Sequence, residues 1–125
     1  MTSFSQTEWK NLQADLSGLK TLIFVGVLVG AGSMIFNFSD GSSLLVQCPF
    51  EAYDDGTSNM GHGESPGTSV ILFGFLNEHI LDAGVDAVGQ VTLKFSAGRG
   101  IRIIPDNSGF ESYVLRTSKG VSPVF

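Results

Sequence analysis

Two stretches of the chain share one pattern: MIFNFSDGSSLLVQ at residues 34–47 and VTLKFSAGRGIRII at residues 91–104. In each, large apolar residues alternate with smaller or polar ones, stop at a Ser-x-Gly turn and then resume the alternation. A period of two is typical of a strand with one buried face. The two stretches therefore predict two β-hairpins that begin 57 residues apart, at residues 34 and 91.

The alternation also predicts the length of the turn. A three-residue loop sets Phe36 opposite Leu44 and, in the second hairpin, Leu93 opposite Ile101, so that apolar residues share one face. Such loops place their last residue in the left-handed region, where glycine costs least. Both hairpins have glycine there, at residues 41 and 98. The residues expected in the core of these hairpins are Phe36, Phe38, Leu93 and Phe95.

The 57-residue offset extends beyond the hairpins. Leu19 aligns with Leu76, and after a three-residue insertion Phe50-Glu51-Ala52-Tyr53 aligns with Phe110-Glu111-Ser112-Tyr113. Self-similarity at a fixed spacing is typical of duplicated structure. We therefore predict a single domain over residues 1–125, with repeat 1 at about 5–53, a connecting acidic loop at 54–64 and repeat 2 at about 65–117.

Each repeat is predicted to begin with a helix. The first has a capping box at Ser5 and Glu8, followed on one helical face by Trp9, Leu12 and Leu16. The second would begin at Pro66, although Gly67 and Gly74 oppose it, and its apolar residues are Val70, Leu72, Phe73 and Leu76. The predicted fold class is α+β, mostly antiparallel β, with two pseudo-symmetric helix-plus-β-meander repeats.

The segment Thr21–Ser39 has no charged residue over 19 positions, which is long enough to span a bilayer. The counterpart of Thr21–Phe38 at the 57-residue offset is Glu78–Phe95, which carries acids and a lysine. Each charge at the centre of a membrane helix costs about 2.5–3.5 kcal/mol. We therefore expect neither segment to cross a membrane. Cys48 is the single cysteine, and residues 1–10 lack the basic and apolar regions of a secretory signal. These features predict a cytoplasmic protein.

The chain has a net charge of −5, from twelve acidic and seven basic residues. Residues 1–64 hold seven of the acids and two of the bases, whereas residues 65–125 hold five of each. An acidic surface disfavours nucleic acid, because phosphates require Lys and Arg. It favours basic protein partners, mainly through electrostatic steering.

The sequence predicts a protein that is not an enzyme. Cys48, His62 and His79 do not have the spacing of metal ligands, and Cys48 falls on the apolar parity of its strand, where a buried thiol is expected. The repeated Phe-Glu-x-Tyr motif, with Glu51 and Glu111, is interpreted as a packing motif rather than as a pair of acting carboxylates. We therefore predict no catalytic, metal-binding or cofactor-binding residue and no cofactor.

The connection from Tyr53 to Gly67 has no apolar periodicity and is expected to be an exposed loop. Long loops without secondary structure are usually functional or disordered. Its charged and titratable residues are the predicted partner-binding residues, Asp54, Asp55, His62 and Glu64. The alternative interpretation is a flexible linker between the two repeats.

The repeated pattern of Phe-Ser-x-Gly, an apolar strand and Phe-Glu-x-Tyr, over roughly residues 16–118, resembles a group of small bacterial proteins with duplicated hairpins. Some of these are immunity proteins of contact-dependent growth inhibition and related polymorphic toxin systems. The resemblance implies a cytoplasmic protein that binds and neutralises a cognate toxin domain, a nuclease in the expected case. The alternative is a non-catalytic small-ligand or subunit-binding β domain. The sequence makes no prediction about the oligomeric state.

Overall fold

The computed structural model describes residues 6–106 and 112–121. Its helices are α1 (Gln6–Ser17) and the 3₁₀ helix η1 (Pro66–Phe75). Its strands are β1 (Phe24–Val29), β2 (Met34–Phe38), β3 (Ser43–Val46), β4 (Pro49–Asp54), β5 (Thr57–His62), β6 (Asp82–Val85), β7 (Val91–Lys94), β8 (Gly100–Ile103), β9 (Tyr113–Thr117) and β10 (Gly120–Val121).

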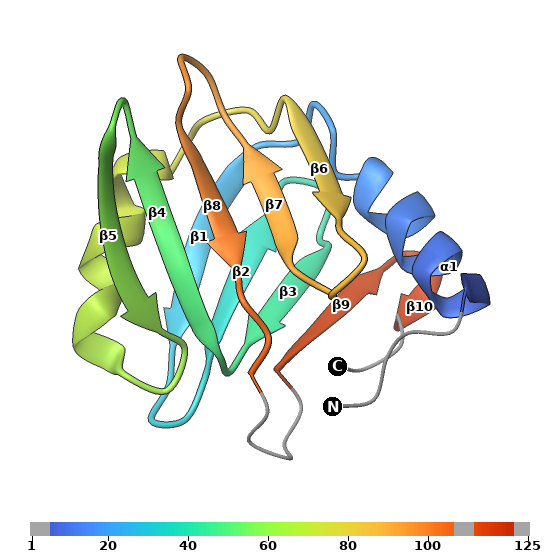
Figure 1. Ribbon diagram of the computed structural model, residues 1–125, viewed down its shortest axis with the longest axis horizontal. Coiled ribbons are helices and arrows are strands. Elements are labelled where there is room, and N and C mark those ends of the chain that lie inside the picture. Colours follow the sequence, from blue (N-terminus) through green and yellow to red (C-terminus); the bar gives the residue numbers. More distant parts are fainter. Residues whose placement is uncertain (1–5, 107–111, 122–125) are drawn as a thin grey trace.

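The strands form two five-stranded antiparallel sheets that face each other (Figure 1). The first sheet has the order β1-β2-β3-β9-β10, and the second has the order β5-β4-β8-β7-β6. Helix α1 lies beside β6 at one side of the sandwich, and η1 lies beside β5 at the other (Figure 1). The predicted class, α+β with mostly antiparallel strands, is therefore confirmed.

The registers of the two hairpins are those that the alternation predicted. Phe36 pairs with Leu44 in the β2–β3 hairpin, and Leu93 pairs with Ile101 in the β7–β8 hairpin. In both hairpins the residue before the loop donates its amide to the residue after it, so that each loop has three residues: Phe38 to Ser42 at 2.9 Å and Phe95 to Arg99 at 2.9 Å. The glycines at the loop ends have φ angles of 91° at residue 41 and 74° at residue 98, as expected.

The core between the sheets contains a connected cluster of aromatic rings among its aliphatic side chains. The predicted core residues Phe36, Phe38, Leu93 and Phe95 are 0–3% exposed, which confirms their assignment. Phe24 connects the rings of both hairpins, because its centroid lies 5.5 Å from that of Phe36 and 6.2 Å from that of Phe95. Aromatic pairs at these separations add to the free energy of burial.

Each sheet contains strands from both halves of the chain. The chain passes from the first sheet to the second between β3 and β4, so that the β4–β5 hairpin joins the second sheet through β8. The β9–β10 hairpin joins the first sheet through β3 in the same manner. Neither sheet can therefore be completed by one half of the sequence alone.

The registers place the Phe-Glu-x-Tyr motifs differently from the sequence alignment. Ile103 pairs with Phe50, whereas Val46, which precedes Ile103 by the 57-residue offset, pairs with Tyr113. Tyr53, which the sequence alignment matches with Tyr113, pairs with Gly100. Phe110 and Glu111, the other members of the second motif, lie outside the described residues.

The predicted acidic loop at 54–64 is wrong, because most of it forms β5. This strand pairs with β4 along its whole length, from Pro49 opposite His62 to Asp54 opposite Thr57. The two-residue turn is Asp55-Gly56, whose φ angles of 48° and 88° are both positive, as in a type I′ hairpin. Strand β5 has no apolar alternation because it is an edge strand whose residues are mostly exposed.

The second predicted helix exists, but its buried face is not the predicted one. As a 3₁₀ helix, η1 has three residues per turn, and its buried residues Ser69, Leu72 and Phe75 are spaced by three. Leu72 is therefore buried as predicted, whereas Val70 is 61% exposed and Phe73 is 50% exposed. Helix α1 buries Leu12 and Leu16 as expected, and the predicted cap at Ser5 lies outside the described residues.

The uncharged segment Thr21–Ser39 forms the β1–β2 hairpin rather than a helix. Within the described ranges, no helix combines the length and the apolar composition that crossing a bilayer requires.

We predict that Phe95→Ala lowers the free energy of unfolding by about 3–5 kcal/mol, because it removes a ring packed between Phe24 and Phe75. The matched control is Phe73→Ala, which truncates a half-exposed ring and should cost about 1 kcal/mol or less. Urea denaturation of both variants measures the difference. Equal losses in the two variants would show that the inter-sheet ring cluster is not the core.

Candidate partner-binding surface

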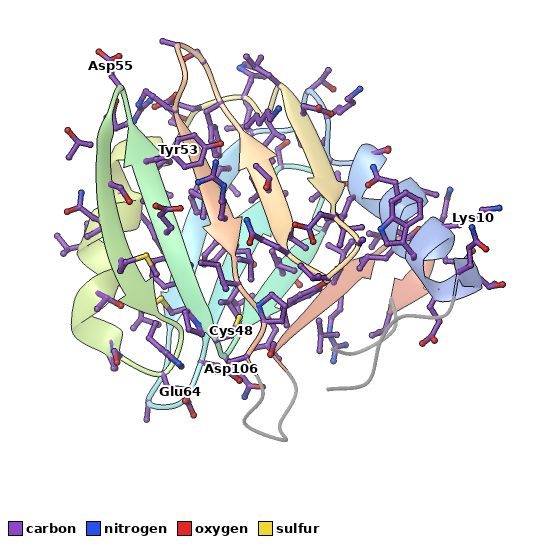
Figure 2. All side chains as sticks on the ribbon, in the orientation of Figure 1. Lys10, Cys48, Tyr53, Asp55, Glu64 and Asp106 are labelled. Atoms are coloured by element: carbon purple, nitrogen blue, oxygen red, sulfur yellow. The ribbon has the colours of Figure 1, made fainter. Side chains whose placement is uncertain are left out.

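The four predicted partner-binding residues fall into two groups at opposite ends of the β4–β5 hairpin. Asp54 and Asp55 lie at its turn, whereas His62 and Glu64 lie at and beyond the end of β5. Figure 2 shows Asp55 and Glu64 at these two ends. The six residues of β5 extend from the turn to His62, which corresponds to roughly 20 Å. The predicted residues therefore do not form one continuous site.

The turn end gathers more charge than the sequence indicated. Arg99, from the loop between β7 and β8, contacts the Asp54 carboxylate with its Nε at 3.1 Å and the Glu78 carboxylate with its Nη1. Its Nη2 donates to Gly74 O at 2.9 Å, and its guanidinium lies 4.5 Å from the centroid of the Phe75 ring. The hydrogen bond to Glu78 is the main reason that the pKa of Arg99 is raised.

We call Asp54, Asp55, Glu78 and Arg99 the tip cluster. It contains three carboxylates and one guanidinium, so that its local charge is −2. Arg99 holds two of the carboxylates, whereas in the described chain no side-chain bond is found for Asp55, which is exposed. Sequence reasoning missed Glu78 and Arg99 because both come from the second half of the chain, far from the hairpin in sequence.

At the other end of the hairpin, His62 lies between two carboxylates. Its Nδ1 accepts a hydrogen bond from the Glu64 amide at 3.0 Å, and its Nε2 lies 3.9 Å from Asp106 Oδ2. Because Nδ1 accepts, the proton of the neutral ring is on Nε2 and points toward Asp106. The structure thus brings His62 and Glu64 together, as neighbours in sequence, and adds Asp106 from the segment after β8.

The acidic excess of the first half is partly neutralised by bases of the second half. Glu51 on β4 accepts a hydrogen bond from Arg102 on β8 at 2.8 Å, and the guanidinium of Arg102 covers the Tyr53 ring at 4.5 Å. The Ser58 hydroxyl and then Arg102 lower the pKa of Glu51. The charge asymmetry along the sequence therefore does not become one acidic face.

Cys48 and His62 lie near each other, but the thiol is not an activated nucleophile. Pro49 pairs with His62, and the Gly63 amide donates to Cys48 O at 2.9 Å. Burial, and secondarily the charge of Asp106, raises the pKa of the fully buried Cys48 thiol from 9.0 to about 12, so that it is protonated at neutral pH. His79 is remote from this pair in the fold, because it bridges to Ile23 at the start of β1.

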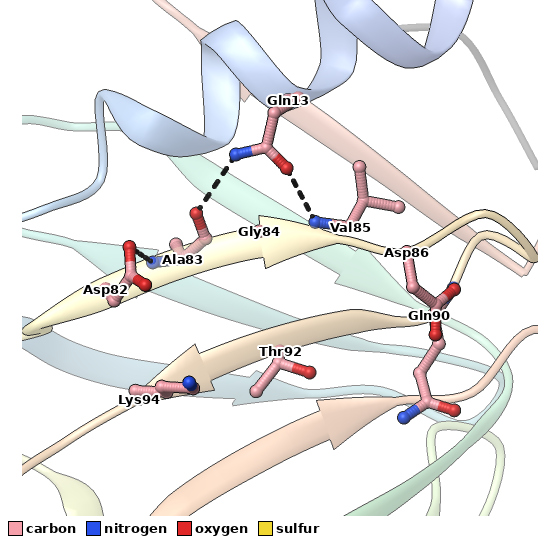
Figure 3. Close-up of a pocket in the computed structure, with 9 residues that line it drawn as sticks. All are labelled: Gln13, Asp82, Ala83, Gly84, Val85, Asp86, Gln90, Thr92 and Lys94. Atoms are coloured by element: carbon pink, nitrogen blue, oxygen red, sulfur yellow. Dashed lines mark hydrogen bonds between the residues drawn. The ribbon is translucent and has the colours of Figure 1, made fainter.

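A polar groove of about 340 Å³ lies between α1 and the outer side of β6 and β7 (Figure 3). The Gln13 side chain spans it: its Oε1 accepts from Val85 N at 2.9 Å, and its Nε2 donates to Ala83 O at 3.5 Å. Trp9 Nε1 also donates to Asp86 O at 3.1 Å. The side-chain amide of Gln13 thus forms hydrogen bonds with the backbone at the edge of β6, as a neighbouring strand would. The apolar pattern of residues 9–16 predicts a helix but does not predict these hydrogen bonds.

We predict that the protein loses stability in alkali through Cys48. A thiol whose pKa is higher in the folded state than in the unfolded chain contributes stability that is complete below pH 9 and is lost as the pH rises toward 12. Burial also raises the pKa of Tyr113, which acts in the same direction. Cys48→Ala should therefore make the free energy of unfolding fall less steeply between about pH 9 and 12. Chemical denaturation at several pH values measures the slope, and identical slopes would contradict this role.

Comparisons with known proteins do not assign the chain to a family. No protein-family model matches the sequence, and neither a curated protein nor a solved structure matches it. Function must therefore be argued from the surfaces and side chains of this molecule.

Proposed function

We propose that this protein is a non-catalytic, cytoplasmic immunity protein that binds and neutralises a basic toxin domain. The observation that carries the proposal is the tip cluster, where Arg99 binds the carboxylates of Asp54 and Glu78 beside the exposed Asp55 at the turn of a hairpin. The resemblance of the repeated sequence pattern to immunity proteins supports the same class. A nuclease is the toxin type that fits the charge, because its cleft must present Lys or Arg to phosphate.

The tip cluster can imitate the charge of a nucleic acid backbone. Asp55 is exposed at the turn, and the neighbouring carboxylates of Asp54 and Glu78 are held in place by Arg99. Negative groups at the rim of an interface mainly raise the rate of association with a positive partner, while buried contacts hold the complex. The cluster would therefore steer the toxin cleft toward this end of the sandwich.

The hairpin that carries the cluster is preorganised. Strands β4 and β5 pair over six residues each, and the Asp55-Gly56 turn has the two positive φ angles of a tight type I′ turn. A partner that binds such a turn does not have to order a flexible loop, which would reduce its affinity. This feature favours binding over the linker interpretation of residues 54–64.

We further propose that the sandwich arose from two copies of one unit, each consisting of a helix, three meandering strands and a hairpin that joins the opposite sheet. If β1, β2 and β3 are matched with β6, β7 and β8, and the β9–β10 hairpin with the β4–β5 hairpin, the two sheets have the same strand order. This agreement supports the duplication. We expect the backbone of residues 19–46 to superpose on that of residues 76–103 in an experimental structure. A helix in one segment where the other has a strand would contradict the duplication.

The alternative function, a small-ligand-binding β domain, has one supporting observation. The groove between α1 and β6–β7 has a volume within the usual range for ligand sites, and Asp82, Thr92 and Lys94 line it (Figure 3). However, the Gln13 amide that spans it already bonds to β6, and such sites are normally lined by apolar side chains. The tip cluster therefore carries the stronger proposal.

We predict that Asp55→Asn slows association with the cognate toxin by roughly two- to tenfold at low salt and changes dissociation little. Asn tolerates the positive φ of 48° at this position, so that only the charge is removed. The partner to test is the product of the gene directly upstream, and stopped-flow or surface-binding kinetics at low and high salt measure the rates. The matched control is Glu64→Gln, which removes an exposed carboxylate at the other end of the hairpin.

The expected control result is an unchanged association rate. Both variants should also be tested for protection of cells that express the toxin, because neutralisation is the proposed activity. If Asp55→Asn binds and protects like the unmodified protein at every salt concentration, the tip cluster is not the binding site. If the upstream product does not bind at all, the immunity function itself is wrong.

A further inference from the structure

The junction between β5 and η1 is held by hydrogen bonds of the backbone and of one hydroxyl. The His62 amide donates to the Thr68 hydroxyl oxygen at 3.1 Å, and the Ser65 amide donates to His62 O at 2.9 Å. The Thr68 hydroxyl in turn donates to Ser65 O at 2.7 Å. None of these groups changes its charge near neutral pH. The Glu64 amide differs from them, because its acceptor is the Nδ1 atom of the His62 ring at 3.0 Å.

The hydrogen bond from Glu64 to His62 exists only while the ring is neutral. A backbone amide can donate but cannot accept, so that the bond requires a free lone pair on Nδ1. In the charged imidazolium both ring nitrogens carry a proton, and neither can accept. Protonation of His62 therefore sets two N–H groups against each other, and the Glu64 amide must lose this acceptor.

Two carboxylates lie where the charged ring would need acceptors. Glu64 Oε1 is 3.8 Å from Nδ1, and Asp106 Oδ2 is 3.9 Å from Nε2. Both distances exceed those of a hydrogen bond, and shifts of roughly 1 Å would close them. The Glu64 side chain is 63% exposed, so that solvent rather than packed protein surrounds it. A charged ring would thus have one carboxylate for each of its two N–H groups, and such charge-assisted bonds are stronger than neutral ones.

The other titratable groups near the ring do not compete with these carboxylates. The Cys48 thiol, at the crossing between β3 and β4, is protonated at neutral pH because burial raises its pKa to about 12. On β4, Pro49 is the residue opposite His62, and Glu51, two positions further on, is bonded to Arg102. In the parts of the chain that the structure describes, the ion-pair partners of the ring are therefore the two carboxylates alone.

We propose that His62 is a pH-sensitive switch at the junction of β5 and η1. In its neutral state the ring accepts from the Glu64 amide, and in its charged state it donates to the carboxylates of Glu64 and Asp106 and releases that amide. Histidine is the side chain whose charge normally changes between about pH 5 and 8, which sets the range of the switch. The two carboxylates carry −2, and the charged ring adds +1, so that the group carries −1 below the transition.

The change is confined to Glu64, because the remaining bonds of the junction do not involve the ring. The contacts of Thr68 and Ser65 with the His62 backbone are the same in both states. The Glu64 carboxylate turns from solvent toward the ring, so that an acid exposed at high pH is neutralised at low pH. The tip cluster lies at the other end of the hairpin, roughly 20 Å away, and the switch therefore does not require a toxin partner.

The experiment is an NMR titration of the full, ¹⁵N-labelled chain between about pH 5 and 8. The ring nitrogen shifts of His62 report whether the ring is neutral or charged. Above the transition we expect a scalar coupling between the Glu64 amide nitrogen and His62 Nδ1, which the hydrogen bond transmits. As the ring becomes charged, this coupling should be lost, and the Glu64 amide proton should move upfield with the same midpoint.

The variant His62→Asn locks the neutral arrangement. The Asn Oδ1 atom takes the place of Nδ1 and can accept from the amide two residues further on, but it does not titrate. The Glu64 amide shift of this variant should therefore stay constant over the same pH range. The matched control is His79→Asn, at the exposed histidine that bridges to Ile23, and there the Glu64 amide should move as in the unmodified protein.

The proposal is overturned if the His62 ring stays neutral down to about pH 5, or if the coupling to the Glu64 amide persists after the ring has become charged. It is also overturned if the Glu64 amide of His62→Asn moves with pH as it does in the unmodified protein. Circular dichroism establishes that both variants are folded. The coupling is measured in the unmodified protein, so that it decides the question if His62→Asn does not fold.

Discussion

The rest of the structure depends on one constraint: the β4–β5 hairpin joins the second sheet and the β9–β10 hairpin joins the first. We call this arrangement the exchange of hairpins. Only Gln47 and Cys48 separate β3 in the first sheet from β4 in the second. The crossing is held by hydrogen bonds from the Gln47 amide to Ser112 O at 2.8 Å and from the Gly63 amide to Cys48 O at 2.9 Å. A Cβ at Gly63 would lie 2.1 Å from Val46 O, so that this close approach requires glycine.

The exchange decides the electrostatics of the surface. It lays the acidic β4–β5 hairpin against β8 and the β7–β8 loop, which carry Arg102 and Arg99. Acids of the first half are thereby paired with bases of the second half, as Glu51 is with Arg102 and Asp54 with Arg99. A surface that attracts a basic partner at one end, rather than over a whole face, would also fix the orientation of that partner.

Two kinds of surface result. The tip cluster is charged, preorganised and displayed on a hairpin that is bonded along its length. Strand β1 has no charged residue and carries the exposed apolar side chains of Val25, Leu28 and Val29. The one thiol of the molecule, Cys48, is fully buried, and burial raises its pKa so that it is protonated at neutral pH.

By itself, the sequence determined the features that depend on neighbouring residues: α1, the strands β2, β3, β7 and β8, their three-residue turns, their paired registers and the burial of Phe36, Phe95 and Cys48. These follow from side-chain parity, which is a local property of a strand. The Asp55-Gly56 turn was also readable as a hairpin signal, but β5 carries no apolar alternation because it lies at an edge. The tertiary structure alone decided which sheet each hairpin joins, which face η1 buries, and the meeting of Asp54 and Glu78 at Arg99. Those outcomes depend on contacts between residues far apart in the chain, and such contacts leave no periodic pattern in the sequence.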